Sequence, residues 1–187
     1  MAPAFGRIAR NYPEVTLEVA VEDGFVDIVA RRFDAGIRLG DSVGREMIAV
    51  PITRELRTAI VASPAYFAEH PPPRTPRELL GHRCIGYRQI ASGALYRWEF
   101  DQNGEKLDVA VTGPLVLDDA ELMICAALDG DGLAYATENM VSDHLAAGRL
   151  VRVLEDWCSP YAGFHVYYPS RRQLSAAVRA VIQELRV

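Results

Sequence analysis

The sequence predicts an α/β protein, because helix-like and strand-like segments alternate along it and short glycine-marked turns join them. The clearest example is the segment 117–154, where two amphipathic helices each precede a short apolar strand. Asp118 and Asp119 are the expected caps of the first of these helices, and Gly130 marks its end. A second observation is that the sequence pattern changes near Ser63, where short helices and a proline run replace the alternation of longer helices and strands.

The N-terminal part begins with an expected helix over residues 3–11. Apolar and polar side chains then alternate over residues 15–21, as in a strand with one buried face. Asp23 is the expected cap of a helix that carries Ile28 and Val29 on its apolar side. Three strands should follow, one ending at Gly40 and two at residues 47–52 and 56–61.

The middle of the chain is expected to hold short helices that start at Ser63 and Thr75, each followed at once by proline. Asn103-Gly104 lies between two alternating runs and predicts a hairpin. The other expected elements are the hairpin strands 96–100 and 107–111, strands at 83–87, 115–117, 133–136, 150–154 and 164–168, and helices that start at Asp119, at Thr137 or Asn139, and at Ser170.

Composition limits the possible functions. The 187 residues carry a formal net charge of −5 and an isoelectric point near 5.4, and Lys106 is the single lysine. Clustered cations are needed to hold a nucleic-acid backbone, so these residues alone are not expected to bind DNA usefully. There is no apolar run of about 18 residues and no secretory signal pattern, so we expect a cytoplasmic protein with no membrane partner.

Patterns that would indicate chemistry are weak. The four histidines are far apart in the sequence, so each is expected to be an ordinary residue, and neither a metal nor another cofactor is predicted. Residues 129–132 resemble a calcium loop, but Ala134 and Met140 occupy the places of its glycine and its bidentate glutamate. No nucleophile elbow, phosphate-binding loop or Ser-His-Asp spacing is found, so no enzyme activity is predicted.

The cysteines and one tryptophan are expected to be core residues. Cys84, Cys125 and Cys158 are odd in number and far apart, which argues against a disulfide framework. Trp98 follows the alternation of its strand and is more readily explained by burial than by stacking against a ligand.

Several blocks of sequence keep the order and spacing of one known family. They are YPEVTLEVAVEDGFVDIVARR, FDAGIRLGD, LRTAIVASPAYFAEH, TPRELLGHRCIGYR, GDGLAY with HLAAGRLVRVL, and VYYPSRRQLSAAVRAVIQEL. Over nearly the whole chain they resemble the effector-binding domain of LysR-type transcriptional regulators. The resemblance implies a type 2 periplasmic-binding-protein-like fold, in which two α/β subdomains are joined by two crossing strands. The implied subdomains are residues 1–62 with 168–187, and residues 63–167.

The resemblance also implies a function, which is sensing of a small effector held between the subdomains, together with dimerisation. The alternative is a free-standing solute-binding protein of the same fold, and an enzyme on this scaffold is a third possibility. DNA would be reached only through a helix-turn-helix that these residues lack. The first strand of the domain is also expected to be missing before Met1. The expected partner is a second copy of the chain, with the helices after Asp23 and Asp118 as candidate surfaces.

Candidate effector contacts are the ends of strands and the starts of helices, where ligands bind in α/β folds. The glycine-rich segment departs from the family, because Thr137 stands where relatives tend to have proline, which changes the polarity there. The predicted contacts are Glu22, Arg38, Gly40, Tyr87, Ser92, Gly93, Asp119 and Thr137.

A small organic anion is the expected effector. Helix N-termini attract negative charge, and the Arg38 guanidinium can hold a carboxylate. Simpler roles stay open: Asp119 as a cap only, Arg38 in a surface ion pair with Asp34 or Asp41, and Ser92-Gly93 as a plain turn. Carboxylates near the same place would repel an anion unless they turn outward as caps, namely those of Glu22, Asp23, Asp118 and Asp119.

Overall fold

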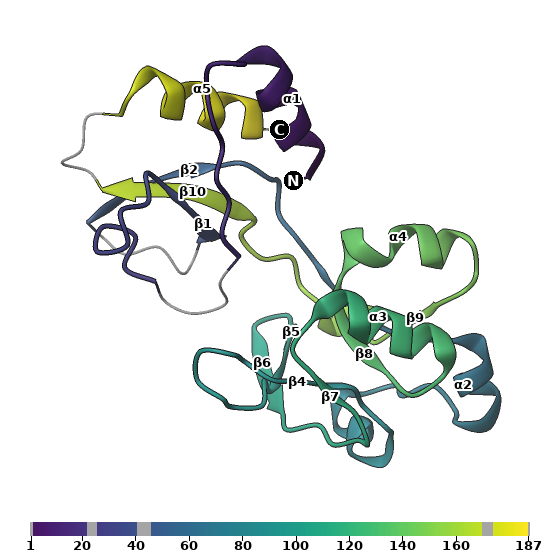
Figure 1. The fold of residues 1–187 in the computed structure, drawn as a ribbon. Helices are drawn as coiled ribbons and strands as arrows, with labels where there is room; N and C mark the ends of the chain where they lie inside the picture. The colour runs from purple at the N-terminus through teal and green to yellow at the C-terminus, as the bar shows by residue number, and fades with distance from the viewer. Residues whose placement is uncertain (1, 22–25, 41–45, 170–173, 187) are drawn as a thin grey trace. The chain divides into compact units, whose positions relative to one another are not determined.

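The computed structural model describes residues 2–21, 26–40, 46–169 and 174–186. By contacts the chain forms two compact units (Figure 1). Unit 1 comprises Met1–Glu55 and Ala162–Val187, and unit 2 comprises Leu56–Tyr161, so the chain crosses between the units twice. Each unit has its own sheet and its own apolar core.

The two crossing segments are hydrogen bonded to each other. In unit 2, Leu56 and Tyr161 exchange two backbone hydrogen bonds of 3.0 and 2.9 Å. In unit 1, the Ile52 N–H donates to the Phe164 carbonyl oxygen at 2.9 Å. Gly163 lies so close to Arg54 that an added Cβ would overlap the Arg54 carbonyl oxygen, so the close approach of the segments requires glycine.

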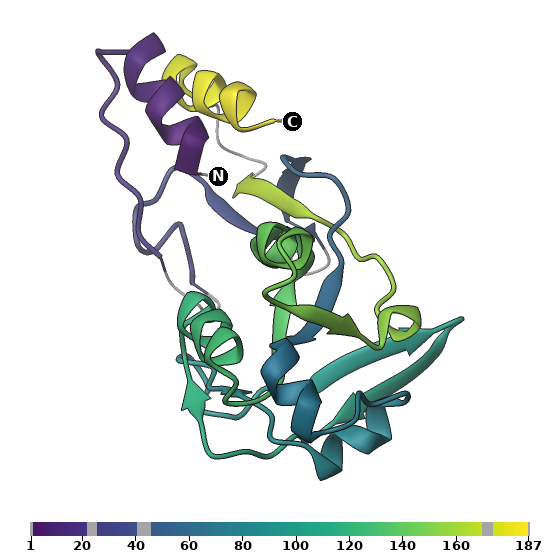
Figure 2. The same ribbon diagram turned by 90° about the vertical axis from the view of Figure 1, so that its right-hand side faces the viewer.

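Unit 1 is a three-stranded antiparallel sheet with two helices against it. The strand order is β1 (Gly36–Leu39), β10 (Phe164–Pro169), β2 (Met47–Pro51). The helices α1 (Ala2–Asn11) and α5 (Ala176–Leu185) lie side by side (Figure 2). The buried residues of the core cluster in this unit come from both helices and from the sheet side: Ala4, Ile8, Ile52, Val166, Ile182 and Leu185.

The strand predicted at residues 15–21 is wrong. This segment has no regular secondary structure, and Val19 and Val21 are 51% and 95% exposed. A strand requires a hydrogen-bonded neighbour, and none of the described strands pairs with these residues. The alternation of side chains was therefore not sufficient to make a strand here.

The helix predicted after Asp23 is also wrong where it can be judged. Residues 22–25 lie outside the described part of the chain, and residues 28–32 form turns. The Asp27 carboxylate accepts hydrogen bonds from the backbone N–H groups of Val29 and Ala30. Such side-chain bonds offer the backbone an alternative to a helix, and the segment ends in a left-handed residue, Arg32.

The central strand of unit 2 is β3 (Thr58–Ala62). It lies between β8 (Ala134–Thr137) and β9 (Val151–Val153) and is antiparallel to both. Every residue of β3 is buried. Because successive side chains of a strand point to opposite faces, this pattern requires that both faces of the sheet are covered.

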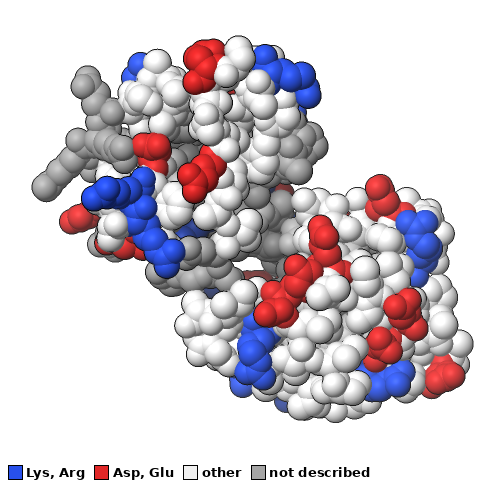
Figure 3. Space-filling view, in the orientation of Figure 1, with Lys and Arg blue, Asp and Glu red and all other residues white. Residues whose placement is uncertain are grey.

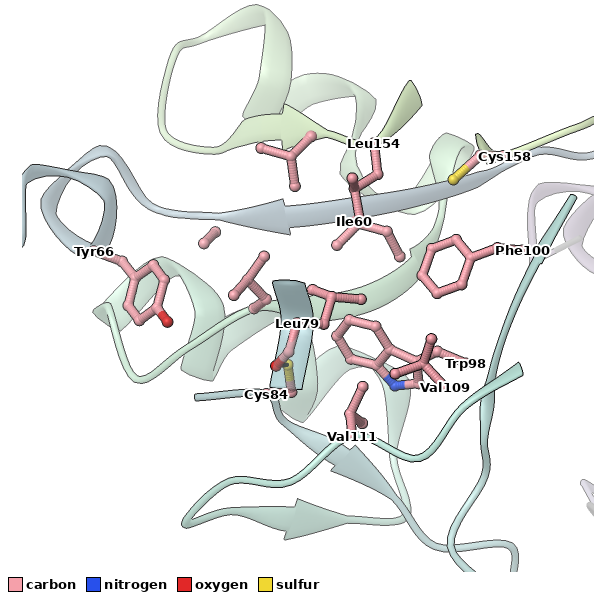
Figure 4. Close-up of a cluster of buried hydrophobic side chains, with 13 residues drawn as sticks. Ile60, Tyr66, Leu79, Cys84, Trp98, Phe100, Val109, Val111, Leu154 and Cys158 are labelled. Atoms are coloured by element: carbon pink, nitrogen blue, oxygen red, sulfur yellow. Dashed lines mark hydrogen bonds between the residues drawn. The ribbon is translucent and has the colours of Figure 1, made fainter. Parts of the chain in front are cut away.

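Two apolar clusters provide that cover. Ala59 and Val61 belong to one cluster with residues of α3 (Ala120–Asp129) and α4 (Glu138–Ala146). Ile60 belongs to the other, in which it lies near Trp98 and Phe100 (Figure 4). The elements that contribute to this second cluster are α2 (Pro64–Glu69), the 3-10 helix η2 (Pro76–Gly81) and the hairpin of β5 (Trp98–Gln102) and β6 (Glu105–Val109).

A second pair of strands extends the sheet. β4 (Gly86–Tyr87) and β7 (Val116–Leu117) are parallel. A parallel bridge between Cys84 and Leu133 links the segment that leads into β4 to the segment that leads into β8. The strands β4, β7 and β8 therefore run in the same direction.

Most predicted elements of unit 2 are confirmed, including their turns. Asn103 and Gly104 have φ angles of 54° and 87°, as a two-residue hairpin turn with positive φ at both positions requires. The Asp119 carboxylate caps α3 by accepting the Leu122 N–H at 2.9 Å. Gly130 ends α3 in the left-handed region, with a φ of 89°. Thr137 is the residue that precedes α4.

Some predicted boundaries are shifted. The strand expected from residue 56 begins at Thr58, the strand at 83–87 is shortened to β4, and the helix expected near Thr75 is a 3-10 helix. The final helix begins after Ser175, whose hydroxyl accepts the Val178 N–H at 3.2 Å. The contact division falls a few residues before the expected subdomain limits at 62 and 168, because β3 pairs within unit 2 and β10 within unit 1.

Candidate functional site

The candidate site lies at one edge of the unit 2 sheet, where three parallel strands end. β4 ends at Tyr87, β7 at Leu117 and β8 at Thr137. Because these strands share a direction, their carboxyl ends meet at the same edge, which is where ligands bind in α/β sheets. α3 and α4 begin directly after β7 and β8, so the positive ends of two helix dipoles lie at this edge.

The loop that follows β4 is held beside the start of α3. The Arg88 N–H donates to the Leu117 carbonyl oxygen at 2.7 Å, and the Gln89 N–H donates to the Ala94 carbonyl oxygen at 3.0 Å. The Ser92 hydroxyl donates to the Gln89 side chain at 3.0 Å, and Gly93 has a φ of 69°. Glycine suits this conformation, and the loop satisfies part of its own polar groups without a ligand.

Five of the predicted contacts therefore belong to one edge and its adjoining loop: Tyr87, Ser92, Gly93, Asp119 and Thr137. Asp119 is engaged as the cap of α3. Thr137 occupies the same position before α4, but its hydroxyl makes no capping bond. The first turn of α4 is thus capped less completely by its own side chain than the first turn of α3.

The other predicted contacts lie in unit 1 or outside the described residues. Arg38 is on β1 opposite His165, with its guanidinium carbon 5.7 Å from the centre of the Tyr167 ring, a distance at which a cation is attracted to the ring. The Gly40 N–H donates to the Gly163 carbonyl oxygen at 3.1 Å. Glu22 is among the residues that the structure does not describe.

A polar chain at the unit 2 edge was not predicted. Thr58 is the register partner of Thr137, and its hydroxyl donates to the Tyr135 hydroxyl at 3.2 Å. The Tyr135 hydroxyl in turn donates to the Glu99 carbonyl oxygen at 3.2 Å, and the Tyr96 ring lies 5.6 Å from the Tyr135 ring. Burial raises the pKa of both phenols, so they are neutral near pH 7 and act as hydrogen-bonding groups.

Arg152 is the second feature that sequence reasoning missed. Its side chain is 11% exposed and forms ion pairs with Glu138 at 3.1 Å and Glu155 at 3.5 Å. It also donates to the Thr58 carbonyl oxygen at 2.7 Å, while its Nε has no partner in the described part of the chain. The signal in the sequence was a charged residue inside the apolar strand LVRVL. Through Glu138, Arg152 ties the first residue of α4 to β3.

The two buried cysteines show no sign of reactivity, and the described residues form no metal site. Burial raises the pKa of Cys84 to about 12 and that of Cys158 to about 11, so neither is a reactive thiolate. The prediction that all three cysteines are core residues is wrong for Cys125, which is exposed. In the segments that the structure covers, no group of three His, Cys, Asp or Glu residues is placed to hold a metal ion.

A separate groove of about 330 Å³ lies between α3 and α4. Apolar side chains form much of its lining, and Leu122 on α3 is 55% exposed. Exposed apolar residues on one helix are common where another protein binds. The lining residues are Glu121, Ile124, Cys125, Leu128, Met140 and His144.

Charge and hydropathy add two further observations. On the face drawn in Figure 3, positive and negative side chains are interspersed over both units. Within the described ranges, no helix is both long and apolar enough to cross a bilayer. The first observation agrees with the acidic composition, which does not favour contact with a nucleic-acid backbone.

The two α/β units and the double crossing of the chain define a type 2 periplasmic-binding-protein-like fold, a class of small-molecule-binding domains. The family described as the LysR substrate binding domain matches residues 1–187, and the chain belongs to this family. The predicted family and fold are therefore confirmed, and no comparison favours a free-standing solute-binding protein.

Relatives and solved structures agree with this assignment. A Pseudomonas aeruginosa protein named as a transcriptional regulator is 45% identical over 186 residues, which are 100% of this chain and 61% of the relative. The Escherichia coli regulator PgrR is 34% identical over 186 residues, 100% of this chain and 62% of PgrR. The chain thus spans about three fifths of the length of these curated relatives.

Among solved structures, the regulatory domain of AphB from Vibrio vulnificus has a TM-score of 0.83 and 24% identity, and covers 99% of this chain and 90% of that chain. Full-length AphB from Vibrio cholerae, a member of the LTTR family, has a TM-score of 0.83 and 24% identity, with coverage of 99% and 62%. At this level of identity the likeness establishes the fold.

Proposed function

We propose that this LysR substrate-binding domain senses a small organic carboxylate, catalyses no reaction, and acts as a homodimer in a cytoplasmic transcriptional regulator. Binding of the effector changes the population of domain conformations, which alters the arrangement of DNA-binding modules elsewhere in the regulator. The observation that carries the proposal is the unit 2 edge, where three strand ends and two helix N-termini meet.

The charges at this edge favour an anion, because the nearby carboxylates of Asp119 and Glu138 already have partners. Asp119 accepts the Leu122 N–H as a cap, and Glu138 is paired with Arg152. These two carboxylates are therefore already engaged. The Thr137 hydroxyl makes no capping bond, so an anion beside it would find a donor and the positive end of α4, worth about 0.3 to 1 kcal/mol.

The predicted contacts Tyr87, Ser92, Gly93 and Thr137 form the unit 2 part of the proposed site, with Asp119 as a positioning cap. Arg38, Gly40 and Glu22 of unit 1 stay proposed contacts, as predicted from the sequence. Tyr135 and the mostly buried Arg152 both hydrogen bond to Thr58, which is the register partner of Thr137. They therefore stabilise the edge at Thr137.

A thermal-shift screen tests the proposal. Aromatic and aliphatic carboxylates, with their uncharged amides as controls, are added to the wild type and to Thr137→Val, Arg38→Ala and Ser92→Ala. A carboxylate at about 100 times its dissociation constant should stabilise the wild type by about 2.7 kcal/mol. Loss of the Thr137 hydroxyl should weaken binding about ten-fold or more, since a hydrogen bond to a charged group contributes about 1.5 to 3 kcal/mol.

Ser142→Ala is the matched control, because Ser142 is an exposed hydroxyl farther along α4. It should bind the carboxylate as the wild type does. The proposal is wrong if amides or cationic compounds stabilise the protein while carboxylates do not. A carboxylate that shifts Thr137→Val as strongly as the wild type would remove Thr137 from the site.

The proposed dimer uses the exposed apolar surface of α3. Leu122 is 55% exposed on this helix beside the groove, whereas Leu80 is 63% exposed on η2. We expect Leu122→Asp to give a monomer by sedimentation at micromolar concentration, and Leu80→Asp to leave the dimer intact. Equal dissociation by both variants, or a wild type that is already monomeric, would contradict this surface.

A further inference from the structure

Two histidines converge on one buried tyrosine in unit 2, His70 from four residues along the chain and His82 from sixteen. Tyr66 lies on α2 and is 2% exposed. The His82 Nδ1 is 3.0 Å from the Tyr66 hydroxyl, and the His70 ring stacks on the Tyr66 ring at 4.4 Å, nearly parallel. This cluster was not predicted, because each histidine was interpreted as isolated from its spacing to the others.

The hydrogen bonds around Tyr66 favour one arrangement of its protons. The Tyr66 oxygen accepts the backbone N–H of Arg83 at 3.1 Å. Burial raises the pKa of the phenol, so Tyr66 keeps its proton. Because the Arg83 N–H already occupies an acceptor position of the phenol oxygen, the phenol proton can be donated to the His82 Nδ1, and we infer this arrangement. In this arrangement His82 is neutral and carries its proton on Nε2.

The surroundings of His82 oppose its protonation. Burial and the neighbouring His70 lower the pKa of His82, and Glu78 acts in the opposite direction. Glu78 is itself engaged by the Arg74 N–H and the Thr75 hydroxyl, at 3.0 Å each. The Arg83 guanidinium lies 5.4 Å from the centre of the Tyr66 ring and brings a permanent positive charge to the cluster.

The other element packed on η2 does not supply a compensating buried charge. β6 places Leu107 and Val109 in or against the core, whereas Lys106 and Asp108 are exposed. Cys84 follows Arg83 and is a neutral, buried thiol whose pKa is raised to about 12. A proton on His82 would therefore meet His70 and Arg83 with Glu78 as the nearest opposing group.

We propose that the contact of Tyr66 with His82 is a proton-operated latch, which fastens α2 to the segment before β4 when His82 is neutral and opens when His82 is protonated. Protonated Nδ1 is a donor, so it no longer accepts the phenol proton. The phenol O–H then loses the acceptor of its own proton, which weakens the contact and disturbs the hydrogen bond from the Arg83 N–H. The latch acts on unit 2 independently of an effector.

The sign of the pH effect follows. A histidine with a lowered pKa in the folded state contributes stability that is fully present above its ordinary value of about 6.5 and is lost as pH falls through the folded-state pKa. Unit 2 should therefore become easier to unfold in mildly acidic solution. Both tryptophans, Trp98 and Trp157, lie in unit 2, so their fluorescence reports its unfolding.

The direct test is nuclear magnetic resonance of the full 187-residue chain between pH 5 and 8. The Nε2–H tautomer of His82 is expected at pH 8, and the Arg83 amide resonance is expected to shift with the same midpoint as the His82 ring. In Tyr66→Phe, the His82 midpoint should move up, since the neutral imidazole loses the hydrogen bond from the phenol. His144→Asn on α4 is the control, and this variant should leave the pH dependence of the Arg83 amide unchanged.

His82→Asn provides a variant without titration, because the amide oxygen of asparagine can accept the phenol proton in place of Nδ1. We expect its Arg83 resonance and its urea midpoint by tryptophan fluorescence to become independent of pH between 5 and 7. The latch is overturned if His82 carries its proton on Nδ1 at pH 8. It is also overturned if the Arg83 amide does not follow His82, or keeps its pH dependence in His82→Asn.

Discussion

Each unit contains a three-stranded sheet, but the two sheets are buried differently. In unit 2, β3 sends alternate residues into two apolar clusters, and all five of its residues are buried. In unit 1, β1 is only half-buried, and three of the five residues of β2 are exposed, with one apolar cluster in the described residues. Stability from apolar burial grows with the area removed from water, so unit 2 should be the more stable unit.

This difference has a functional meaning. The unit 2 edge that carries the proposed effector contacts is supported by two covered sheet faces and by the mostly buried Arg152. Strand ends on such a support are positioned with little freedom. The unit 1 contributions, Arg38 and Gly40, come from a thinner scaffold and should be ordered less strictly.

The largest expected effect is at Trp98, which is fully buried in the larger of the two unit 2 clusters (Figure 4). Trp98→Ala should reduce the free energy of unfolding by about 3–5 kcal/mol, the usual cost of deleting a buried aromatic side chain. Urea unfolding followed by Trp157 fluorescence and circular dichroism measures it. Trp98→Phe should cost much less, because it keeps most of the ring and removes an indole N–H that has no partner among the described residues.

Ile8 is the matched position in unit 1, fully buried between α1 and the sheet. Ile8→Ala should cost about 2–3 kcal/mol, because the half-exposed neighbours in this cluster can relax into the space. Circular dichroism should detect the loss, while the tryptophan midpoint stays unchanged because both tryptophans are in unit 2. If both signals shift equally, the units unfold together and the contrast between them fails.

The β5–β6 hairpin covers one face of the unit 2 sheet, and its turn depends on Gly104. Gly104→Ala should cost about 1–2 kcal/mol, because the φ of 87° is unfavourable for any residue with a Cβ. Gly81→Ala is the control, since Gly81 is not in the left-handed region and nothing would contact its added Cβ within 4 Å. Equal urea midpoints for the two variants would show that the hairpin turn does not contribute to the stability of unit 2.

The smallest expected effect is the difference in stability lost when the residue before α3 or the residue before α4 is changed to alanine. Asp119→Ala should cost about 1 kcal/mol, because the Asp119 carboxylate caps α3. Thr137→Ala should cost only a few tenths, since its hydroxyl makes no capping bond to α4. Thermal unfolding of both variants without ligand gives the comparison. A larger loss for Thr137→Ala would mean that its hydroxyl has a structural partner.

Much of unit 2 was predictable because its local signals agree with its packing. The apolar run around Ile60 predicted a buried strand, Asn103-Gly104 predicted the hairpin, and Asp119 predicted the start of α3. The predictions for residues 15–21 and 28–32 of unit 1 were wrong because alternation and capping residues report only on local preference. Whether a strand forms depends on a neighbour to pair with, which no local pattern contains.

The candidate site was predictable only in part, for a similar reason. Strand ends and helix starts can be read locally, which placed Tyr87, Asp119 and Thr137 at the edge. The Thr58 to Tyr135 chain, the ion pair of Arg152 with Glu138 and the contact of Tyr66 with His82 join residues far apart in sequence. Such contacts follow from the packing of whole elements, so spacing along the chain gives no indication of them.

The central claim is that the carboxyl edge of unit 2 binds the effector, and hydrogen exchange tests it most directly. The carboxylate with the largest thermal shift is added at saturation, and amide exchange is compared with that of the free protein by mass spectrometry. We predict slower exchange in peptides that cover residues 87–94 and 137–139. Protection confined to the groove between α3 and α4, with residues 87–94 unchanged, would contradict the claim.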